Sequence, residues 1–390
     1  MSRGVPGSVA ATSPVEAVQS NPVAAGVAVV VGLAILVGLV LLVRRYRRTT
    51  GEKFLRQLAS RDAISVLMHP NPDPDAMACA LGVAQLAEAA DVEAHLQYPG
   101  QIRHQENRAF WTVLDLDFDR VENTHDLEAE TVVLVDHNEP RGFVGAEAID
   151  PFAVIDHHPG SGTGSAFTDV RPEYGSCASI LAEYFRQMGW EPIPPGVEVE
   201  NGREKALPSD VATGLVYGIQ SDTKQLTKGC SRAEFEASAY LYDGVDEDRL
   251  DRIANPQVDA EVLDVKARAI NERTVRNAFA VSDVGDVSNV DAIPQAADEL
   301  TRLEGVTAVV VFGQKDGQIH LSGRSRDDRV HMGKTLEAVV EEIPMASAGG
   351  HARMGGGQLS LEHMEGIGPS EGLDCDELVE NLFEGMAGEL

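Results

Sequence analysis

The chain has 390 residues, and its 62 Asp and Glu against 32 Lys and Arg give a formal net charge of −30. At about 100–200 residues per domain this length predicts two or three domains, and a hydrophobic content of 43% excludes a chain that is disordered throughout. The acidic balance argues against binding of nucleic acid through a broad basic face. The four cysteines fit neither a zinc ribbon nor a disulfide scaffold.

The first element in chain order is an uncharged apolar run, which arginines follow at positions 44, 45, 47 and 48. At about 1.5 Å per residue the run is long enough to cross a bilayer, so we expect a transmembrane helix over residues 22–44. The positive-inside rule then places residues 1–21 outside the cell membrane and the catalytic part in the cytoplasm. A cleaved signal peptide would carry its positive charges before the run.

Alternating apolar strands and helices follow the apolar run. The strands are expected at residues 64–68, 131–135, 153–155 and 307–312, and the helices at residues 76–90, 177–188, 211–220, 232–242 and 259–277. This order predicts an α/β fold with a doubly wound, mainly parallel sheet. Proline and glycine in residues 191–208 predict a surface loop. We expect a catalytic domain over 62–255, a linker helix over 256–277 and a smaller α/β domain over 278–388.

Three of the expected strands end in loops rich in Asp and His, over residues 69–75, 136–138 and 156–159. The carboxyl ends of parallel strands meet at one edge of a sheet, so these loops should face one crevice. Asp222 ends a later apolar helical stretch. The loops and this residue together offer a set of His, Asp, Asp, Asp, His and Asp side chains as candidate metal ligands.

This ligand set combines imidazole nitrogen with carboxylate oxygen, which suits Mn²⁺, Fe²⁺ or Zn²⁺. Without a metal the carboxylates would repel one another. Six ligands exceed one tetrahedral site but fit two metals that share a bridging carboxylate, the usual device for displacement at phosphorus. Each loop alone has a plain structural alternative, such as a turn or a helix N-cap. All three loops together with Asp222 favour the metal site.

The same motifs resemble those of the DHH phosphoesterase family. The resemblance rests on His-x-Asn-Pro-Asp-x-Asp at 69–75, Val-Asp at 135–136, Asp-His-His at 156–158 and Asp222. It continues in His-Leu-Ser-Gly-Arg-Ser-Arg at 320–326 and in the Gly-Gly-His loop at 348–357, which are similar to the family's C-terminal DHH-associated domain. It spans about residues 62–370. One departure is Pro74, where the family often has glycine, and it puts the local loop geometry in doubt.

Carried over by position, the resemblance implies that His69 and Asp73 hold one metal and that Asp136 bridges to a second. Asp75, His157 and Asp222 would complete the second site. His158 would contact the substrate phosphate, and Asp156 would orient an imidazole. The catalytic residues are therefore Asp136, Asp156 and His158.

The resemblance also implies substrate-binding residues outside the metal cluster. Arg324 and His351 would bind a phosphate or terminal nucleotide, which the neighbouring glycines would let the backbone approach. These glycines are Gly349, Gly350, Gly355, Gly356 and Gly357. Residues 101–108 are similar to a His/Asn element of some members, which implies a substrate contact at His104, although a surface helix position is the alternative.

The function expected from these residues is that of a membrane-anchored, Mn²⁺-dependent phosphodiesterase or phosphatase with two divalent metal ions. The substrate would be a short oligonucleotide, a cyclic or linear dinucleotide, or 3′-phosphoadenosine 5′-phosphate. The alternatives are a RecJ-like single-strand exonuclease, a family II pyrophosphatase, and a non-catalytic nucleotide receptor at the membrane. The resemblance also implies a homodimer.

The charge distribution adds an expectation about the environment of the protein. Acidic residues are dispersed along the chain, and lysine occurs at only seven positions. This composition is typical of proteins from salt-in halophilic archaea, with an ordinary acidic protein as the alternative. At molar salt the Debye length is about 3 Å, so the acidic surface would barely repel a small anionic substrate.

Overall fold

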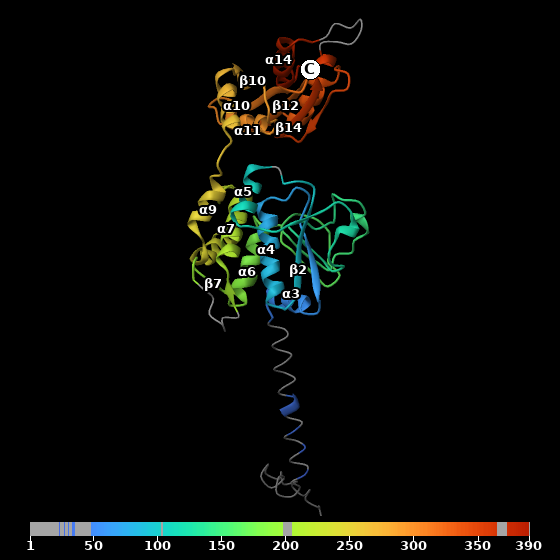
Figure 1. Cartoon of the computed structure of the whole chain (residues 1–390), viewed down its shortest axis with the longest axis vertical. Coiled ribbons are helices and arrows are strands. Elements are labelled where there is room, and N and C mark those ends of the chain that lie inside the picture. Colours follow the sequence, from blue (N-terminus) through green and yellow to red (C-terminus); the bar gives the residue numbers. More distant parts are fainter. Residues whose placement is uncertain are drawn as a thin grey trace, which may run out of the picture. The chain divides into compact units, whose positions relative to one another are not determined.

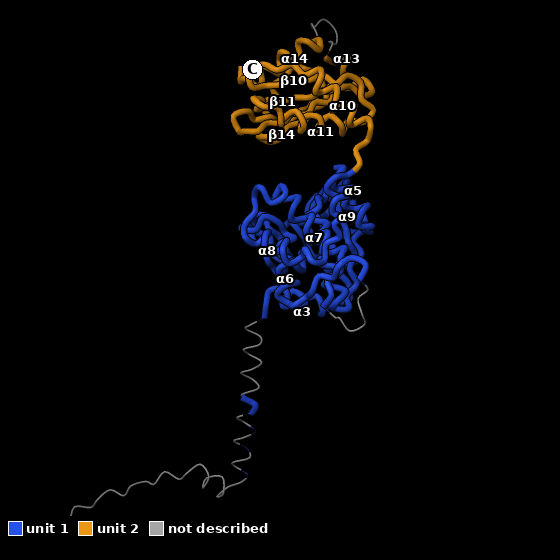
Figure 2. Tube along the Cα trace, turned by 90° about the vertical axis from the view of Figure 1, so that its left-hand side faces the viewer, with its two compact units in different colours: residues 1–256 blue, residues 257–390 orange. Residues whose placement is uncertain are grey.

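The computed structural model describes residues 23, 27, 30, 33–35, 48–102, 104–197, 205–364 and 373–389. The chain divides into two compact units, unit 1 over Met1–Pro256 and unit 2 over Gln257–Leu390, which Figure 2 colours separately. Each unit has its own sheet and its own hydrophobic core, so each is described by itself.

The predicted localisation as a single-pass membrane protein is contradicted. Among the described residues, no helix combines the length and the apolar character needed to cross a bilayer. Most of the predicted span over residues 22–44 lies outside the described residues. The orientation derived from that span, with the N-terminus outside, is therefore withdrawn.

Unit 1 is built on a six-stranded parallel sheet (Figure 1), in the order β3-β2-β1-β4-β5-β6. The order reverses between β1 and β4, which lie side by side although they are far apart in the chain. Ligands of open α/β sheets bind at such a point, beyond the carboxyl ends of the strands. The strands are β1 (Ala63–Leu67), β2 (Glu93–Pro99), β3 (Asp119–Val121), β4 (Val132–Val135), β5 (Ala153–Asp156) and β6 (Phe167–Val170).

The helices of unit 1 pack mainly on one face of this sheet. Ile64, Val66, Val133 and Val135 point into the larger core with the helices, whereas Leu134 on the alternate face joins a small cluster covered by loops. The helices are α3 (Thr50–Leu58), α4 (Pro74–Glu88), α5 (Gln105–Val113), α6 (Cys177–Gln187), α7 (Ser209–Asp222), α8 (Arg232–Leu241) and α9 (Glu247–Ala254).

Several expectations for unit 1 are confirmed and others need correction. The strands expected at 64–68, 131–135 and 153–155 and the helices expected at 76–90, 177–188, 211–220 and 232–242 are present within a few residues. The sheet is parallel, but its second face is not covered by a helical layer, because the connections after β3 and β4 contain only the short 3₁₀ helices η1 (Thr124–Asp126) and η2 (Ala146–Ala148). The expected loop at 191–208 also holds a two-stranded parallel pair, β7 (Glu191–Pro192) and β8 (Ala206–Leu207).

Unit 2 is a second α/β unit, as expected, with a mixed sheet in the order β13-β14-β12-β11-β10-β9. Among the described strands of this sheet, only the pair β10–β11 is parallel. The segment expected as a linker helix at 256–277 contains α10 (Ala260–Asn271) and β9 (Thr274–Arg276), and both lie in this unit. The other strands are β10 (Phe279–Asp286), β11 (Ala308–Lys315), β12 (Gln318–Ser325), β13 (Ser347–Gly350) and β14 (Met354–Ser360).

Helices cover both faces of the sheet in unit 2. Val309 and Val311 of β11 pack with α10 and α11 (Ala292–Leu300) on one face. Val310 and Phe312 pack on the other face with α12 (Met332–Val340) and α14 (Cys375–Ala387). Alternate residues of β11 thus face opposite sides of the sheet. The centre of the sheet is buried between the two helix layers. The short helix α13 (Leu361–Met364) follows β14.

Candidate metal centre

The loop after β1 turns directly into α4 and carries three of the predicted ligands. Asp73 is the N-cap of α4, and its Oδ1 accepts hydrogen bonds from the backbone N–H groups of Asp75 and Ala76, both at 3.1 Å. Pro74 occupies the first turn of α4. Backbone N–H groups in the first turn of a helix have no hydrogen-bond partner within the helix, so the N–H that proline lacks is not missed there. The doubt that proline raised for this loop is thereby removed. The other oxygen of Asp73, Oδ2, faces His69 at 3.6 Å.

The end of β4 places Asp136 at the middle of the cluster. Its backbone N–H donates to the carbonyl of Ile155 at 2.9 Å. Its φ of 60° lies in the left-handed region. This conformation is unfavourable for a residue other than glycine, so the surrounding structure must stabilise it. The side chain is buried, yet neither carboxylate oxygen has a partner with hydrogen-bond geometry. Buried carboxylate oxygens without partners are rare, because the lost hydration is not replaced.

Each candidate imidazole is fixed by a backbone carbonyl. His157 Nδ1 lies 3.2 Å from the carbonyl oxygen of Tyr174, and His69 Nδ1 lies 3.0 Å from that of Pro70. In both rings Nδ1–H is therefore the donor, and Nε2 faces the carboxylates. This is the orientation that metal-bound histidines show in proteins.

Asp156 and His158 lie beside the cluster. Asp156 Oδ1 accepts both the backbone N–H and the Nδ1–H of His158 at 3.0 Å, and its Oδ2 accepts from Asn138 at 2.7 Å. The His158 side chain is 52% exposed. Asp156 therefore holds the ring of His158 at the mouth of the cluster, where Nε2 is the nitrogen left to meet a substrate.

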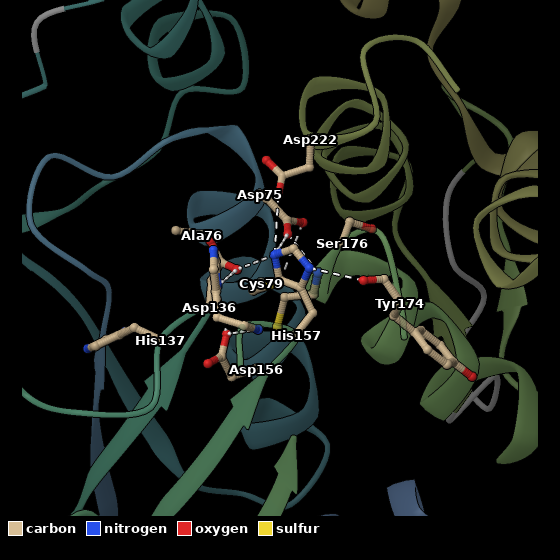
Figure 3. Close-up of polar contacts among 12 residues, drawn as sticks. Asp75, Ala76, Cys79, Asp136, His137, Asp156, His157, Tyr174, Ser176 and Asp222 are labelled. Carbon is tan, nitrogen blue, oxygen red and sulfur yellow. Dashed lines mark hydrogen bonds and ion pairs between the residues drawn. The ribbon is translucent and has the colours of Figure 1, made fainter. Parts of the chain in front are cut away.

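The Asp and His side chains form three overlapping groups whose ligand atoms lie within 4.8 Å of one another, namely His69 with Asp73 and Asp136, Asp75 with His157 and Asp222, and Asp136 with His157 and His158. We describe them as two metal positions. The His69 position consists of His69, Asp73 and Asp136, with His69 Nε2 3.5 Å from Asp136 Oδ2. The His157 position consists of Asp136, His157, Asp75 and Asp222, and Figure 3 shows three carboxylates converging on one ring. His157 Nε2 lies 3.3 Å from Asp136 Oδ1, 3.2 Å from Asp222 Oδ2 and 3.9 Å from Asp75 Oδ2.

The electrostatics of the cluster favour a bound cation. Burial opposes a charged ring, but the nearby carboxylates of Asp136 and Asp73 raise the pKa of His69 to about 11. Likewise Asp136 and Asp222 overcome burial and raise the pKa of His157 to about 12. Burial alone would raise the pKa of the Asp136 carboxyl, but the imidazoles of His157 and His69 outweigh it and lower this pKa. The metal-free site thus draws protons onto its imidazoles, and a divalent cation would replace them.

The residues present fit divalent metal ions. The two oxygens of Asp136 and Nε2 of His157 are buried without hydrogen-bond partners, and each oxygen points to a different set of side chains. The donors are imidazole nitrogens and carboxylate oxygens, which suit Mn²⁺, Fe²⁺ or Zn²⁺. These observations support a metal centre at the predicted residues.

The predicted glycines of unit 2 line a separate pocket of about 710 Å³. They lie in paired strands and not in a loop: β13 holds Gly349 and Gly350, and β14 holds Gly355, Gly356 and Gly357. Gly350 has a φ of +141°, and a Cβ there would lie 2.4 Å from the carbonyl oxygen of Met354, so no other residue fits. Residues of these two strands and of β12 line one side of the pocket, which we call the glycine floor.

Arg324 lies in this pocket, but its guanidinium already has partners. Nε donates to Asp298 Oδ1 of α11 at 2.5 Å, and Nη1 donates to Ser322 Oγ at 3.1 Å. Asp298 is the more exposed partner, with 61% of its side chain accessible against 18% for Arg324. The pocket therefore presents a cation that is oriented by an exposed carboxylate.

Two predicted substrate-binding residues do not join these sites. His351 is exposed and is not among the residues that line the pocket of unit 2. His104 is the exposed N-cap of α5 and makes no capping bond with its side chain. Their roles stay predictions.

Several residues of the site were missed from the sequence. His137 is buried beside His69, with the centroids of the two rings 6.4 Å apart and an angle of 84° between the ring planes. Burial lowers the pKa of His137 to about 4, so its ring is neutral. Asn138 and Asp298 were also missed. Asn138 follows Asp136 in the β4 motif and could have been found there, whereas nothing in the sequence pairs Asp298 with Arg324.

A parallel sheet that gathers acids and imidazoles around one buried carboxylate is the arrangement of an α/β protein with a candidate metal centre at the ends of its strands. Residues 63–219 match the DHH family, N-terminal domain, and residues 276–367 match the DHHA1 domain. The chain therefore carries a DHH-family domain followed by a DHHA1 domain. The predicted ligands up to His157 lie inside the first match, and Asp222 lies three residues beyond its end.

Relatives support this assignment. The chain is 34% identical over 309 residues to an uncharacterised protein of Methanocaldococcus jannaschii, which covers 79% of this chain and 60% of that protein. It is 28% identical over 348 residues to a cyclic-di-AMP phosphodiesterase of Geobacillus thermodenitrificans, with 85% of this chain and 49% of that protein covered. The chain thus spans about half to three fifths of the length of these relatives.

The fold is also found in a solved structure. An exopolyphosphatase-related protein from Bacteroides fragilis superposes with a TM-score of 0.61 at 15% identity, over 87% of this chain and 96% of that one. At this identity the likeness establishes the fold alone.

Proposed function

We propose that the protein is a metal-dependent phosphoesterase of the DHH type that hydrolyses a small nucleotide substrate. Two divalent ions would be held at the His69 and His157 positions, and we propose Mn²⁺ from among the ions that these ligands suit. The observation that carries the proposal is Asp136, whose two buried oxygens lack hydrogen-bond partners and face two different ligand sets.

When bound, such ions lower the pKa of a water and neutralise the charge that grows on phosphate oxygens during hydrolysis. The protein residues supply the geometry for this chemistry. Asp136 would contribute to both positions, because its backbone is held at the end of β4 by the bond to Ile155 and its two oxygens face the two ligand sets. Asp156 holds the half-exposed ring of His158 and raises its pKa. In its protonated form the ring would donate Nε2–H to a substrate phosphate while Nδ1–H stays bonded to Asp156.

The substrate class follows from charge and from the pocket of unit 2. A net charge of −30 and an aromatic content of 5% disfavour long single strands. The glycine floor and Arg324 suit a phosphate or a nucleotide end. One relative is named for hydrolysis of a cyclic dinucleotide. We therefore propose short oligonucleotides, cyclic or linear dinucleotides, or 3′-phosphoadenosine 5′-phosphate as substrates, with unit 2 contributing to their binding.

The direct test is a substrate panel assayed with Mn²⁺, Mg²⁺ or Zn²⁺ in both low and molar KCl. The panel contains cyclic-di-AMP, a linear dinucleotide, 3′-phosphoadenosine 5′-phosphate, a long single strand and pyrophosphate. We expect hydrolysis of a small nucleotide that chelator abolishes and metal restores. Asp150→Asn, at an exposed position outside the cluster, should keep full activity and serves as the control.

Two results would contradict the proposal. Preferred cleavage of the long single strand would favour an exonuclease. Tight binding of a nucleotide without turnover under every metal and salt condition would favour a receptor.

A further inference from the structure

The loop between β6 and α6 and the first turn of α6 contact two ligands of the His157 position through their backbone. In the loop, the carbonyl of Tyr174 accepts Nδ1–H of His157 at 3.2 Å. In the first turn of α6, the N–H of Cys177 donates to Asp75 Oδ2 at 2.6 Å, and the N–H of Ala178 donates to Asp75 Oδ1 at 2.9 Å. Figure 3 shows Tyr174 on one side of the His157 ring and the carboxylates on the other. The loop therefore orients His157, and the first turn of α6, into which the loop leads, orients Asp75.

Arg171 links the same loop to the strand and the helix on either side of it. Its Nε and Nη2 donate to the two carboxylate oxygens of Asp169 in β6 at 2.9 and 2.7 Å. Its Nη1 donates to Glu183 of α6 at 3.0 Å and to the hydroxyl of Tyr174 at 3.1 Å. The Tyr174 hydroxyl in turn donates to Glu183 at 2.5 Å. The Arg171 guanidinium thus forms hydrogen bonds with β6 before the loop, with α6 after it, and with Tyr174 in the loop itself.

This network is largely shielded from water. The exposed fractions of the Arg171, Asp169 and Glu183 side chains are 13%, 14% and 18%. Bidentate pairing of arginine with a carboxylate fixes geometry as well as charge, and partial burial reduces screening by salt. A loop held in this way cannot shift without breaking several charged hydrogen bonds together.

A second anchor acts on the middle of the loop. Glu234 of α8 is fully buried, and its carboxylate accepts the N–H of Gly175 at 2.8 Å and that of Ser231 at 2.5 Å. Because Gly175 follows Tyr174 directly, this contact restrains the peptide whose carbonyl meets His157.

The His69 position has different supports. His69 is oriented by the carbonyl of Pro70, and Asp73 is oriented by the N-terminus of α4. Neither contact includes the loop after β6. The Arg171 network therefore supports one of the two positions and not the other.

We propose that Arg171 is a positioning residue for the His157 position, acting through the carbonyl of Tyr174 on His157 and through the N-terminus of α6 on Asp75. The proposal rests on the proposed function, since it presumes that the cluster binds metal. Loss of an outer contact to a metal ligand typically weakens metal binding about 10- to 100-fold. The distinguishing feature is that only one of two ions should be affected.

The test is calorimetric titration of the metal-free full chain with Mn²⁺. The wild type should bind two ions. Arg171→Met should bind one with unchanged affinity and the other about 10- to 100-fold more weakly, and Arg171→Lys should recover part of that loss. Arg186→Met is the matched control, since Arg186 lies on the same helix α6 in a more exposed pair with Glu236, and it should bind both ions like the wild type.

Tyr174→Phe provides a milder variant in case Arg171→Met does not fold. It removes the hydroxyl that Arg171 and Glu183 share but keeps the carbonyl that meets His157. We expect a several-fold weakening of the same single ion.

The outcomes separate the two proposals. A wild type that binds no Mn²⁺ at the cluster overturns the proposed function and this inference with it. A wild type with two ions, combined with equal weakening of both or of neither in the Arg171 and Tyr174 variants, overturns the role of Arg171 alone.

Discussion

The two units carry their candidate sites in contrasting ways. In unit 1 most ligands are largely buried, and His69, Asp73, Asp75 and His157 are oriented by hydrogen bonds to backbone groups. In unit 2 the pocket is open and floored by glycine strands, and its Arg324 is paired with an exposed carboxylate. A reaction centre requires fixed donor atoms, whereas a recognition surface requires access for a flexible anion. Changes in unit 1 should therefore affect turnover, and changes in unit 2 should affect substrate binding.

The largest effect is expected at Asp136, because it serves both metal positions. Asp136→Asn keeps the shape but replaces one carboxylate oxygen with an amide. Metal ions contribute several kcal/mol to such reactions, so kcat should fall by about 10³-fold or more. Steady-state kinetics at saturating Mn²⁺ test this, with circular dichroism to establish that the variant is folded. A kcat within tenfold of the wild type would contradict the bridging role.

Arg324→Met in unit 2 should show the opposite kinetic pattern. Loss of a charged hydrogen bond to substrate phosphate costs about 1.5–3 kcal/mol, which corresponds to a KM about 10- to 100-fold higher. The value of kcat should stay within about threefold, since binding is lost equally from substrate and transition state. A large fall in kcat with unchanged KM would place Arg324 in the reaction and not in recognition.

Asp298→Asn should change KM by a smaller amount and in the other direction. Asp298 now holds the Arg324 guanidinium and adds negative charge to the pocket. Exposed ion pairs are worth about 0.2–1 kcal/mol, so releasing Arg324 should lower KM by up to about fivefold. If KM rises instead, the ion pair itself is the structure that the substrate recognises.

Pro74→Ala should give the smallest effect and only on stability. Proline at the start of a helix stabilises by about 0.4–1 kcal/mol through the unfolded chain, which corresponds to a melting temperature lower by about 1–4 °C. The N-cap bonds of Asp73 do not depend on Pro74, so kcat should not change. Differential scanning calorimetry and a parallel assay test both statements, and a strong loss of activity would show that proline shapes the metal loop itself.

The sequence was sufficient to predict which side chains of unit 1 gather. Asp and His residues after three apolar strands had to meet, because parallel strands end at one edge of the sheet. The contacts that orient them could not be predicted in the same way. The carbonyl of Tyr174 and the N–H of Cys177 are backbone groups, which any residue would supply, and their positions depend on the loop that Arg171 holds.

In unit 2 the sequence was less informative. The glycines at 349–350 and 355–357 lack side chains with strand preference, so they suggested a loop, whereas cross-strand pairing with β12 makes β14 part of a sheet. Likewise 259–277 has a helical pattern throughout, yet residues 274–276 pair with β10 as an edge strand. Tertiary pairing decided both segments.

The most direct test of the central claim is a crystal structure of the full chain grown with Mn²⁺, with anomalous diffraction measured at the manganese edge. The account predicts two anomalous peaks about 3.5–4 Å apart, one on each side of the Asp136 carboxylate, the first beside His69 and Asp73 and the second beside Asp75, His157 and Asp222. A map with no peak at Asp136, or with manganese only at surface carboxylates, would contradict it.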